Sequence, residues 1–356
     1  MSPRVLAASI AATFLAATVT LVARVDGAAP VRAAAAVTTS TASPTTTEAP
    51  TSTSTDPTTT TAPPTTTAAP PPPPPANPAD ARLAPFRGLG VWIDVFDFSP
   101  AYMQAGEATP VVTPADVDRM ATLGVRTIYI QAARDDPRTP GDLESPAVLA
   151  QFLTRAHAHG IKVVGWYLPK NYDDGDLRRF RAMRDFRADG QAFDAIGNDI
   201  EWRAGVPDVA ERNRRLVEMS RRLREESGAV PVAAIVVPPV VKEIVNPAFW
   251  PDFPWAALAP YYDVWMPMGY WTNRRADSPW RNAHTYTGTN IDMIRQRLGN
   301  PQAPVHAIGG IGDTATIPDY QGFVQAARER GVVGASIYDY RTTAPDAWPV
   351  LQGAPG

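Results

Sequence analysis

The sequence contains no cysteine. Disulfide bonds, a thiolate zinc site, a cysteine nucleophile and a lipid anchor on cysteine are therefore excluded. The charges nearly cancel, with a formal net charge of -3 at pH 7. Lysine and arginine form no dense run outside one expected helix, so the basic footprint of a nucleic-acid-binding protein is missing. The core alone must supply the stability of the chain.

The N-terminal part lacks the residue mixture of a folded domain. Residues 1–36 contain Arg4, an uncharged run from Val5 to Ala23 and then Ala-rich sites, which is typical of a signal peptide or an uncleaved signal anchor; the Ala-rich sites favour cleavage. Residues 37–80 are almost wholly Thr, Pro, Ala and Ser, too few apolar side chains to offset the entropy of folding. We expect a disordered, extended linker that presents an exported domain outside the cell or in the cell envelope, with a membrane contact only through residues 1–36.

Residues 81–356 alternate between short runs rich in β-branched and aromatic residues and longer helical patterns, which indicates parallel βα units. About 275 residues suit one (β/α)8 TIM barrel, and we expect it to act as a monomer. A doubly wound open sheet is the alternative, but no glycine-rich phosphate loop follows the first strand. The eight expected strands are 89–98, 125–132, 161–168, 195–202, 230–237, 263–270, 305–311 and 333–340.

The fourth expected strand ends in two acidic residues. Asp199 and Glu201 are two positions apart, so their side chains share one face of the strand about 7 Å apart. Two like charges at this spacing resist joint ionisation, and one carboxyl should stay protonated near neutral pH and act as a general acid. Cleavage of a glycosidic bond requires such an acid. Alternatively, one carboxylate pairs with an arginine or caps a helix.

The segment Phe193-Asp-Ala-Ile-Gly-Asn-Asp-Ile-Glu201 resembles the strand-four motif F-D-G-x-D-x-D-x-E of family 18 glycoside hydrolases, the chitinase-like barrels. The segment from Asp263 to Tyr270 is similar to the M-x-Y-D segment of the same family. Over most of the barrel, the chain also resembles a looser group of bacterial barrels described as glycoside hydrolases. The positions that match the two motifs are Asp194, Asp199, Glu201, Met268 and Tyr270.

The resemblance implies that Glu201 protonates the leaving oxygen, that Asp199 orients a substrate 2-acetamido group, and that Tyr270 hydrogen-bonds this group while it attacks as an internal nucleophile. Three positions depart from the pattern: Ala195 replaces a glycine, Gly197 stands where the middle aspartate belongs, and Trp271 replaces the aspartate after the tyrosine. Gly197 removes a carboxylate that orients Asp199 in the family pattern, which weakens the expectation of substrate assistance.

In a (β/α)8 barrel, polar and aromatic residues at the C-terminal strand ends are the candidates for substrate binding, because aromatic rings stack on sugars and polar groups bind hydroxyls. Trp271 and Tyr338 are the preferred stacking platforms, since they end strands. By alternation, Trp166 and Tyr167 cannot both face the barrel interior. The substrate-binding candidates are Asp94, Gln131, Arg134, Tyr167, Lys170, Trp202, Met268, Trp271, Tyr338 and Asp339.

We identify no metal or cofactor site in the sequence. His157 and His159 are expected to be surface residues, and Asp173 and Asp176 lack the further ligands of a calcium loop and are expected to cap a helix. The leading hypothesis is a glycoside hydrolase that acts on a cell-envelope or extracellular polysaccharide, with an N-acetylated glycan favoured. The alternative is a non-catalytic carbohydrate-binding barrel, which Gly197 favours; a metal-dependent enzyme that processes polysaccharide is a third hypothesis.

Overall fold

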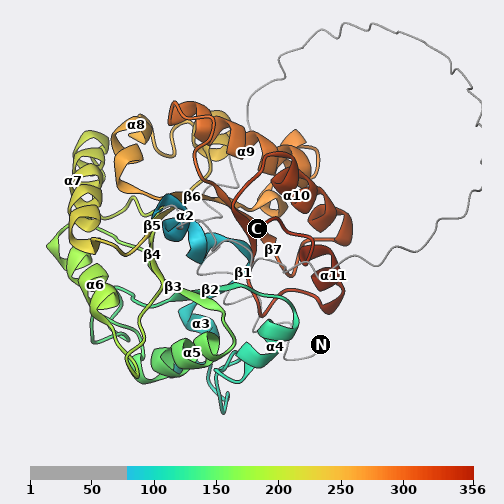
Figure 1. The fold of residues 1–356 in the computed structure, drawn as a ribbon. Helices are drawn as coiled ribbons and strands as arrows, with labels where there is room; N and C mark the ends of the chain where they lie inside the picture. Colours follow the sequence, from blue (N-terminus) through green and yellow to red (C-terminus); the bar gives the residue numbers. More distant parts are fainter. Residues whose placement is uncertain (1–77) are drawn as a thin grey trace, which may run out of the picture. The chain divides into compact units, whose positions relative to one another are not determined.

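The computed structural model describes residues 78–356, with side chains from residue 80. Eight parallel strands form a closed barrel in chain order, surrounded by helices (Figure 1). This confirms the expected (β/α)8 barrel, and the doubly wound alternative is wrong because β1 pairs with β8. The strands are β1 (Gly88–Ile93), β2 (Thr127–Gln131), β3 (Lys162–Tyr167), β4 (Ala195–Ile200), β5 (Val232–Val236), β6 (Val264–Gly269), β7 (His306–Ile311) and β8 (Gly334–Tyr338).

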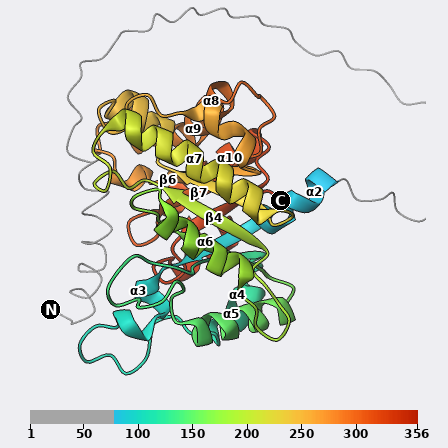
Figure 2. The ribbon, with the colours of Figure 1, turned by 90° about the vertical axis from the view of Figure 1, so that its left-hand side faces the viewer.

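Helices return the chain from the C-terminal to the N-terminal end of the barrel. In Figure 2, α2 and the C-terminus lie at one end and α3 lies toward the other. Asp173 and Asp176 form a capping box at the start of α6, which confirms their expected capping role. The helices are α2 (Pro78–Leu83), α3 (Val95–Phe98), α4 (Asp116–Thr122), α5 (Pro146–Ala158), α6 (Asp174–Asp185), α7 (Val209–Ser227), α8 (Trp255–Leu258), α9 (Ala283–Arg297), α10 (Ile317–Glu329) and α11 (Trp348–Leu351).

The first strand is shorter than its hydrophobic run suggests. It ends at Ile93, because the Asp94 side chain accepts a hydrogen bond from the Phe96 backbone N–H at 2.8 Å and starts α3. Asp97 completes a capping box with the Asp94 backbone. The expected strand 89–98 was therefore too long at its C-terminal end, and the apolar residues that follow Asp94 belong to a helical turn.

Aromatic side chains fill the barrel interior. Trp92 stacks on Tyr129 with ring centroids 4.6 Å apart and meets Trp166 edge-on at 5.8 Å. The indole N–H of Trp92 donates to the Ser336 hydroxyl at 2.8 Å. Three strands are thus tied to β8 across the interior, which is packed rather than open.

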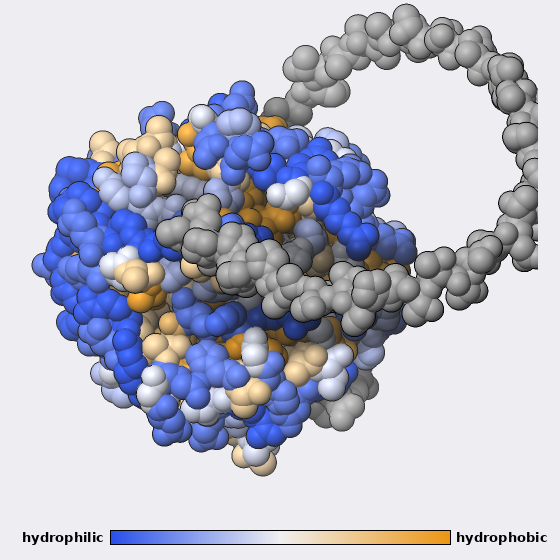
Figure 3. All heavy atoms as spheres, viewed as in Figure 1, coloured by the Kyte–Doolittle hydropathy of each residue, from blue (hydrophilic) through white to orange (hydrophobic). Residues whose placement is uncertain are grey.

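The outer surface over α7 is strongly charged. Arg221 pairs with Glu218 and Glu225 on the same helix, as the sequence predicts for an exposed, salt-bridged helix. Arg212 is an exception, since it is only 3% exposed and donates to the Val206 carbonyl. Figure 3 shows hydrophilic residues over the side of the molecule where α6 and α7 lie.

The helix α2 begins at Pro78 and so crosses the expected boundary between residues 80 and 81. Arg82 in this helix binds both carboxylate oxygens of Asp263, at 2.5 and 2.8 Å, and the Ala229 carbonyl. The expected signal segment 1–36 and most of the expected linker lie outside the described residues. From residue 78 onward, no helix combines the length and the apolar composition needed to cross a membrane.

Asp194, one of the motif positions, lies at the start of β4 and holds β3 in register. Its Oδ2 accepts from the Val163 backbone N–H and from His157, each at 2.8 Å, and its Oδ1 accepts from Lys162 at 2.9 Å. His157 is half-buried and hydrogen-bonded, so the expectation of a solvated surface histidine was wrong. Burial opposes ionisation of Asp194, but the hydrogen bonds from His157, Val163 and Lys162 outweigh it and lower its pKa.

We predict that Asp194→Asn destabilises the fold by about 1–3 kcal/mol near pH 5, because it removes charge-assisted hydrogen bonds at a half-buried site. Asp194 raises the pKa of His157 above 6.5, so the pair stabilises the fold above pH 3.8, where Asp194 is ionised, and loses effect as pH rises through the raised pKa of His157. Chemical denaturation of parent and variant from pH 4 to 9 measures this difference. Parallel stability curves over that range would contradict the prediction.

Candidate active site

Strands on several sides of the ring deliver polar side chains to the C-terminal end of the barrel. Glu201 directly follows β4, Tyr270 follows β6 and Asp94 follows β1. Asp199 is the second-last residue of β4, and Tyr338 is the last residue of β8. None of the five is more than 9% exposed. Because the C-terminal end of the strands carries the active site in barrels of this type, this group forms the candidate active site.

Asp199 and Glu201 form a buried acidic pair. Burial raises the pKa of Glu201 to about 7. Burial and the neighbouring charge of Glu201 raise the pKa of Asp199 well above its usual range. The Oδ1 atom of Asp199 is enclosed and has no hydrogen-bond partner among residues 80–356. At neutral pH the pair therefore retains a proton, which is the state that a general acid needs.

Two tyrosines connect this pair to the opposite side of the barrel. The ring centroids of Tyr270 and Tyr338 are 5.7 Å apart, and the Tyr338 hydroxyl donates to Asp94 Oδ2 at 2.7 Å. Burial and the charges of Glu201, Asp199, Asp339 and Asp94, in that order, raise the pKa of Tyr270 well above its usual value. Tyr270 thus stays protonated and is available as a hydrogen-bond donor between two groups of carboxyls.

The second group of carboxyls lies where β1 and β8 end. One oxygen from each of Asp94, Asp97 and Asp339 lies within 4.8 Å of the other two. Arg341 Nε lies 3.1 Å from Asp97 Oδ1 and supplies a positive charge. Burial raises the pKa of Asp97, and burial together with the charge of Asp94 raises the pKa of Asp339 to about 6. Carboxylate oxygens are the ligands that hard cations prefer, but in this group the Arg341 guanidinium supplies the positive charge that balances the carboxylates.

The interior leaves no room for a carboxylate at position 197. A Cβ atom built on Gly197 would lie 2.8 Å from Ile235 Cδ1 and 3.0 Å from Trp166 Cβ. Trp166 is directed into the barrel, where its ring meets Trp92. The space beside Gly197 is thus taken by Ile235 and Trp166, and Asp199 has no acidic neighbour at position 197.

No protein-family model matches the chain, and no curated protein matches it. Solved structures do match its fold. They include the C-terminal domain of a candidate chitinase from Desulfitobacterium hafniense DCB-2, with TM-score 0.55, 12% identity and coverage of 75% of this chain and 98% of that one. The Group IV chitinase of Ostrinia furnacalis in complex with allosamidin matches with TM-score 0.52, 10% identity and coverage of 75% and 97%. A variant of a family 18 chitinase from Cycas revoluta in complex with (GlcNAc)4 matches with TM-score 0.51, 12% identity and coverage of 74% and 98%.

The chain has the fold of the family 18 chitinases. The resemblance found in strands four and six is thereby extended to the architecture of the whole barrel. At 10–12% identity, the likeness concerns the fold alone. The chemistry of this barrel depends on its own residues at the strand ends.

Six of the sequence candidates gather at the C-terminal end of the chitinase-like barrel, in the acidic and tyrosine groups described above. Met268 is also buried near the end of β6. Lys170 and Trp202 form a separate pair: the Lys170 ammonium lies 5.5 Å from the Trp202 ring, and both side chains are partly exposed. Trp202 is therefore a better stacking platform than the tryptophan that the sequence favoured. The six are Asp94, Asp199, Glu201, Tyr270, Tyr338 and Asp339.

Other candidates serve the packing of the barrel. Trp271 is fully buried against Phe323 of α10, so its expected role as a stacking platform was wrong. Tyr167 faces outward, where its hydroxyl donates to Asp176 and its ring packs on Phe180, so it does not reach the site. Both residues were predicted to bind substrate because they lie at strand ends, but position at a strand end does not give the direction of the side chain.

Gln131 and Arg134 act on the loops at this end. Gln131 is 2% exposed, and its Oε1 accepts from the Val95 backbone N–H at 3.2 Å, which fixes the start of α3. The Arg134 guanidinium lies over the Phe96 ring at 5.0 Å and near Asp136 at 3.7 Å. Gln131 therefore positions Asp94 indirectly, and among residues 80–356 neither residue has a hydrogen bond or ion pair with Asp199 or Glu201.

Sequence reasoning missed the pairing of Asp97 with Arg341 and the filling role of Trp166. The expected closure of the barrel could have indicated the pairing of Asp97 with Arg341, because closure makes β1 and β8 neighbours and brings the residues that follow these strands together. The alternation of side chains along the strand does not tell which of Trp166 and Tyr167 faces the barrel interior. The packing shows that Trp166 does, because its ring meets Trp92, while Tyr167 packs on Phe180.

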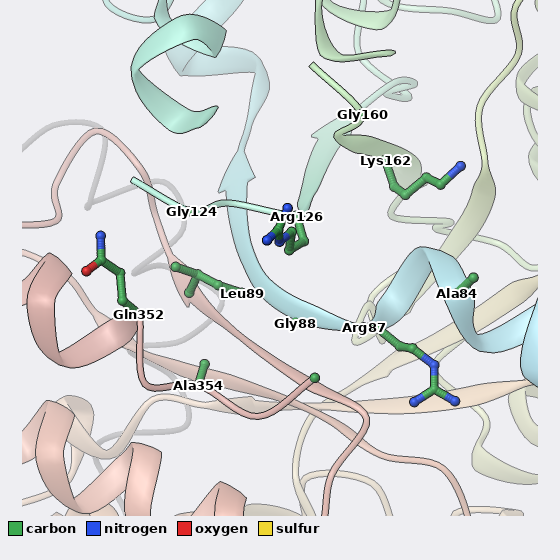
Figure 4. A pocket seen from close by; sticks show the side chains of 11 residues that line it. Ala84, Arg87, Gly88, Leu89, Gly124, Arg126, Gly160, Lys162, Gln352 and Ala354 are labelled. Atoms are coloured by element: carbon green, nitrogen blue, oxygen red, sulfur yellow. The ribbon is translucent and has the colours of Figure 1, made fainter. Parts of the chain in front are cut away.

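A cavity of about 510 Å3 lies at the opposite, N-terminal end of the barrel (Figure 4). Its walls come from the start of β1, the segments before β2 and β3, and the C-terminal residues, with Arg87, Arg126 and Lys162 among them. Two of these cations already have partners: Arg87 pairs with Asp80 and Lys162 with Asp194. None of the candidate catalytic residues lines this cavity, and this end of a (β/α)8 barrel serves stability.

We predict that Gly197→Ala destabilises the fold by about 1–3 kcal/mol, because the added methyl overpacks the interior against Ile235 and Trp166. The double variant Gly197→Ala with Ile235→Val should recover part of this loss, since it removes the atom closest to the new methyl. Thermal and chemical denaturation of the three proteins test the coupling. Equal stability of parent and Gly197→Ala would show that the site has room for a side chain.

Proposed function

We propose that this protein is a glycoside hydrolase that uses Glu201 as its general acid. The observation that carries the proposal is the buried pair of Asp199 and Glu201 at the C-terminal end of the barrel, with the pKa of Glu201 raised to about 7. A carboxylic acid that keeps its proton near neutral pH can protonate the oxygen of a leaving sugar as the glycosidic bond breaks.

The neighbouring residues support this role. Tyr270, whose pKa the charge of Glu201 helps to raise, keeps a protonated hydroxyl that is able to donate to a sugar oxygen. Trp202 is partly exposed next to Glu201 and offers a ring for stacking on a sugar face. The three matching structures described above are named as chitinases, and one contains (GlcNAc)4. We therefore place an N-acetylated glycan first among the polysaccharide substrates to be tested.

The place of action is a second part of the proposal. The apolar run and the Thr/Pro-rich segment before the barrel favour an exported protein whose substrate is a polysaccharide of the cell envelope or its surroundings. The rival function is non-catalytic binding of such a glycan. Gly197 favours this rival, because it removes one acidic partner of Asp199.

We predict that Glu201→Gln lowers the rate of glycan hydrolysis by about 10²–10⁴-fold, as expected when a general acid is removed. The assay measures new reducing ends on chitin oligosaccharides, peptidoglycan and other envelope and plant polysaccharides. Glu225→Gln, which removes an exposed carboxylate on α7, serves as the control and should retain the parent rate. Glycan binding by the parent without hydrolysis of any substrate would establish the non-catalytic function instead.

The rate should also depend on pH in the direction set by Glu201. Since the protonated form is the active one and its pKa is about 7, kcat/KM should fall by about tenfold per pH unit above that value. A pH profile from 5 to 9 with intact fold at each pH provides the measurement. Activity that stays constant up to pH 9 would assign the proton to another group.

A further inference from the structure

The two groups of carboxyls stand on opposite sides of the barrel. In the ring of eight strands, β4 and β8 are separated by four positions in either direction, and β1 is the neighbour of β8. Glu201 therefore follows a strand on one side, and Asp94 and Asp339 follow strands on the other. The charges of both groups raise the pKa of Tyr270, which follows β6. Direct glycoside hydrolysis requires an acid on one face of the sugar and a carboxylate on the other, and the strand order supplies a candidate for each.

Asp339 has one oxygen that is neither hydrogen-bonded nor ion-paired within the described part of the chain, whereas the oxygen of Asp97 that lacks a hydrogen bond lies against Arg341. The Oδ1 atom of Asp339 accepts from the Thr342 backbone N–H at 2.8 Å and from the Thr342 hydroxyl at 2.9 Å. Its Oδ2 has no hydrogen-bond partner within residues 80–356. One oxygen is thus fixed by its own loop, which orients the carboxylate, while the other is available.

The neighbours of Asp339 are already committed. Asp94 accepts from Phe96 N–H through Oδ1 and from the Tyr338 hydroxyl through Oδ2. Asp97 is fully buried, accepts from the Asp94 backbone and lies against Arg341. Both residues therefore set the electrostatic environment of Asp339 rather than face a substrate.

The strand-four site, by contrast, is incomplete for substrate assistance. Asp199 Oδ1 is orphaned, and the space beside it is filled by Trp166 and Ile235 instead of an acidic partner. A substrate acetamido group that acts as the nucleophile has to be oriented and polarised by neighbouring carboxyls. Because this protein lacks the carboxyl at position 197, it needs another group to activate the nucleophile that attacks the anomeric carbon.

We propose that Asp339 is a catalytic residue, the general base that activates water for attack on the anomeric carbon, opposite Glu201. The water oxygen bonds to the anomeric carbon and its proton passes to Asp339 Oδ2, while the bond to the leaving oxygen breaks and that oxygen takes the proton of Glu201. The products are two free hydroxyl groups, with inversion at the anomeric carbon. The substrate then needs no 2-acetamido group, so glycans without it are substrates as well. This inference rests on the proposed glycosidase function.

The pKa values of Asp339 and Glu201 suit the roles of general base and general acid. Burial and the charge of Asp94 raise the pKa of Asp339 to about 6, and the charge of Arg341 holds it from rising further. Asp339 is thus ionised above about pH 6, while Glu201 is protonated below about pH 7, and both conditions hold only in the range between. The titratable and charged groups that face Asp339 are Asp94, Asp97, Tyr270, Tyr320, Tyr338 and Arg341.

The test compares the full-length chain with Asp339→Asn, with Glu201→Gln and with Asp346→Asn, which removes an exposed carboxylate a few residues further on. Each protein is assayed on chitin oligosaccharides and on cello-oligosaccharides, which lack the 2-acetamido group. We expect Asp339→Asn to lose about 10²–10⁴-fold in kcat on both substrates and to lose the acid limb of the pH profile near pH 6. Added azide, a nucleophile that needs no base, should restore turnover in this variant and not in Glu201→Gln.

The stereochemistry of the parent's product is the second measurement and needs no variant. Nuclear magnetic resonance of the first-formed sugar should show inversion. Retention, hydrolysis confined to chitin oligosaccharides, or parent-like activity of Asp339→Asn would each overturn the role of Asp339 while leaving a glycosidase that depends on Glu201. If the parent hydrolyses no glycan at all, the proposed function falls together with this inference.

Discussion

The crowding of inward-facing side chains in a closed barrel controls the rest of this structure. Because alternate residues of every strand point into the same narrow interior, each large side chain restricts what its neighbours can be. Trp92, Tyr129 and Trp166 occupy this space, and Gly197 is the consequence on β4. The polar residues are left at the strand ends, where the aromatic filling stops.

That crowding also explains the unusual electrostatics of the candidate site. A buried carboxylate without a counter-charge is costly, so the group keeps its proton instead. Asp199 and Glu201 have no cationic partner among the described residues, and burial raises the pKa of both. Asp97 and Asp339 share one cation, Arg341, and their pKa values are raised as well. A fold selected for stability alone would place apolar groups here. A cluster of carboxyl groups with shifted pKa values is typical of functional sites.

The sequence predicted the barrel well, because strand and helix signals are local. Glycines with positive φ, such as Gly124 and Gly160, end helices just before strands, and all eight strands lie where the apolar runs do. The site was predicted less completely, since it depends on contacts between distant segments. Alternation brought Asp199 and Glu201 together on one strand, but it could not show that Trp271 turns toward α10 or that Arg341 lies against Asp97. Asp94 was recognised as a strand-end residue, whereas its capping of α3 became visible only with the loop in place.

The departures from the family 18 motif are linked rather than independent. Trp166 packs in the interior beside β4, and Ile235 together with the Cβ of Trp166 leaves no volume for the middle aspartate at position 197. Asp199 consequently cannot share its proton along the strand, and its orphaned Oδ1 favours the neutral form. In this barrel, Glu201 lies at the end of β4, and the acidic residues Asp94 and Asp339 lie at the ends of β1 and β8. Carboxylates on two sides of the ring are what the proposed direct attack by water requires, whereas attack from within the substrate would depend on the strand-four residues alone.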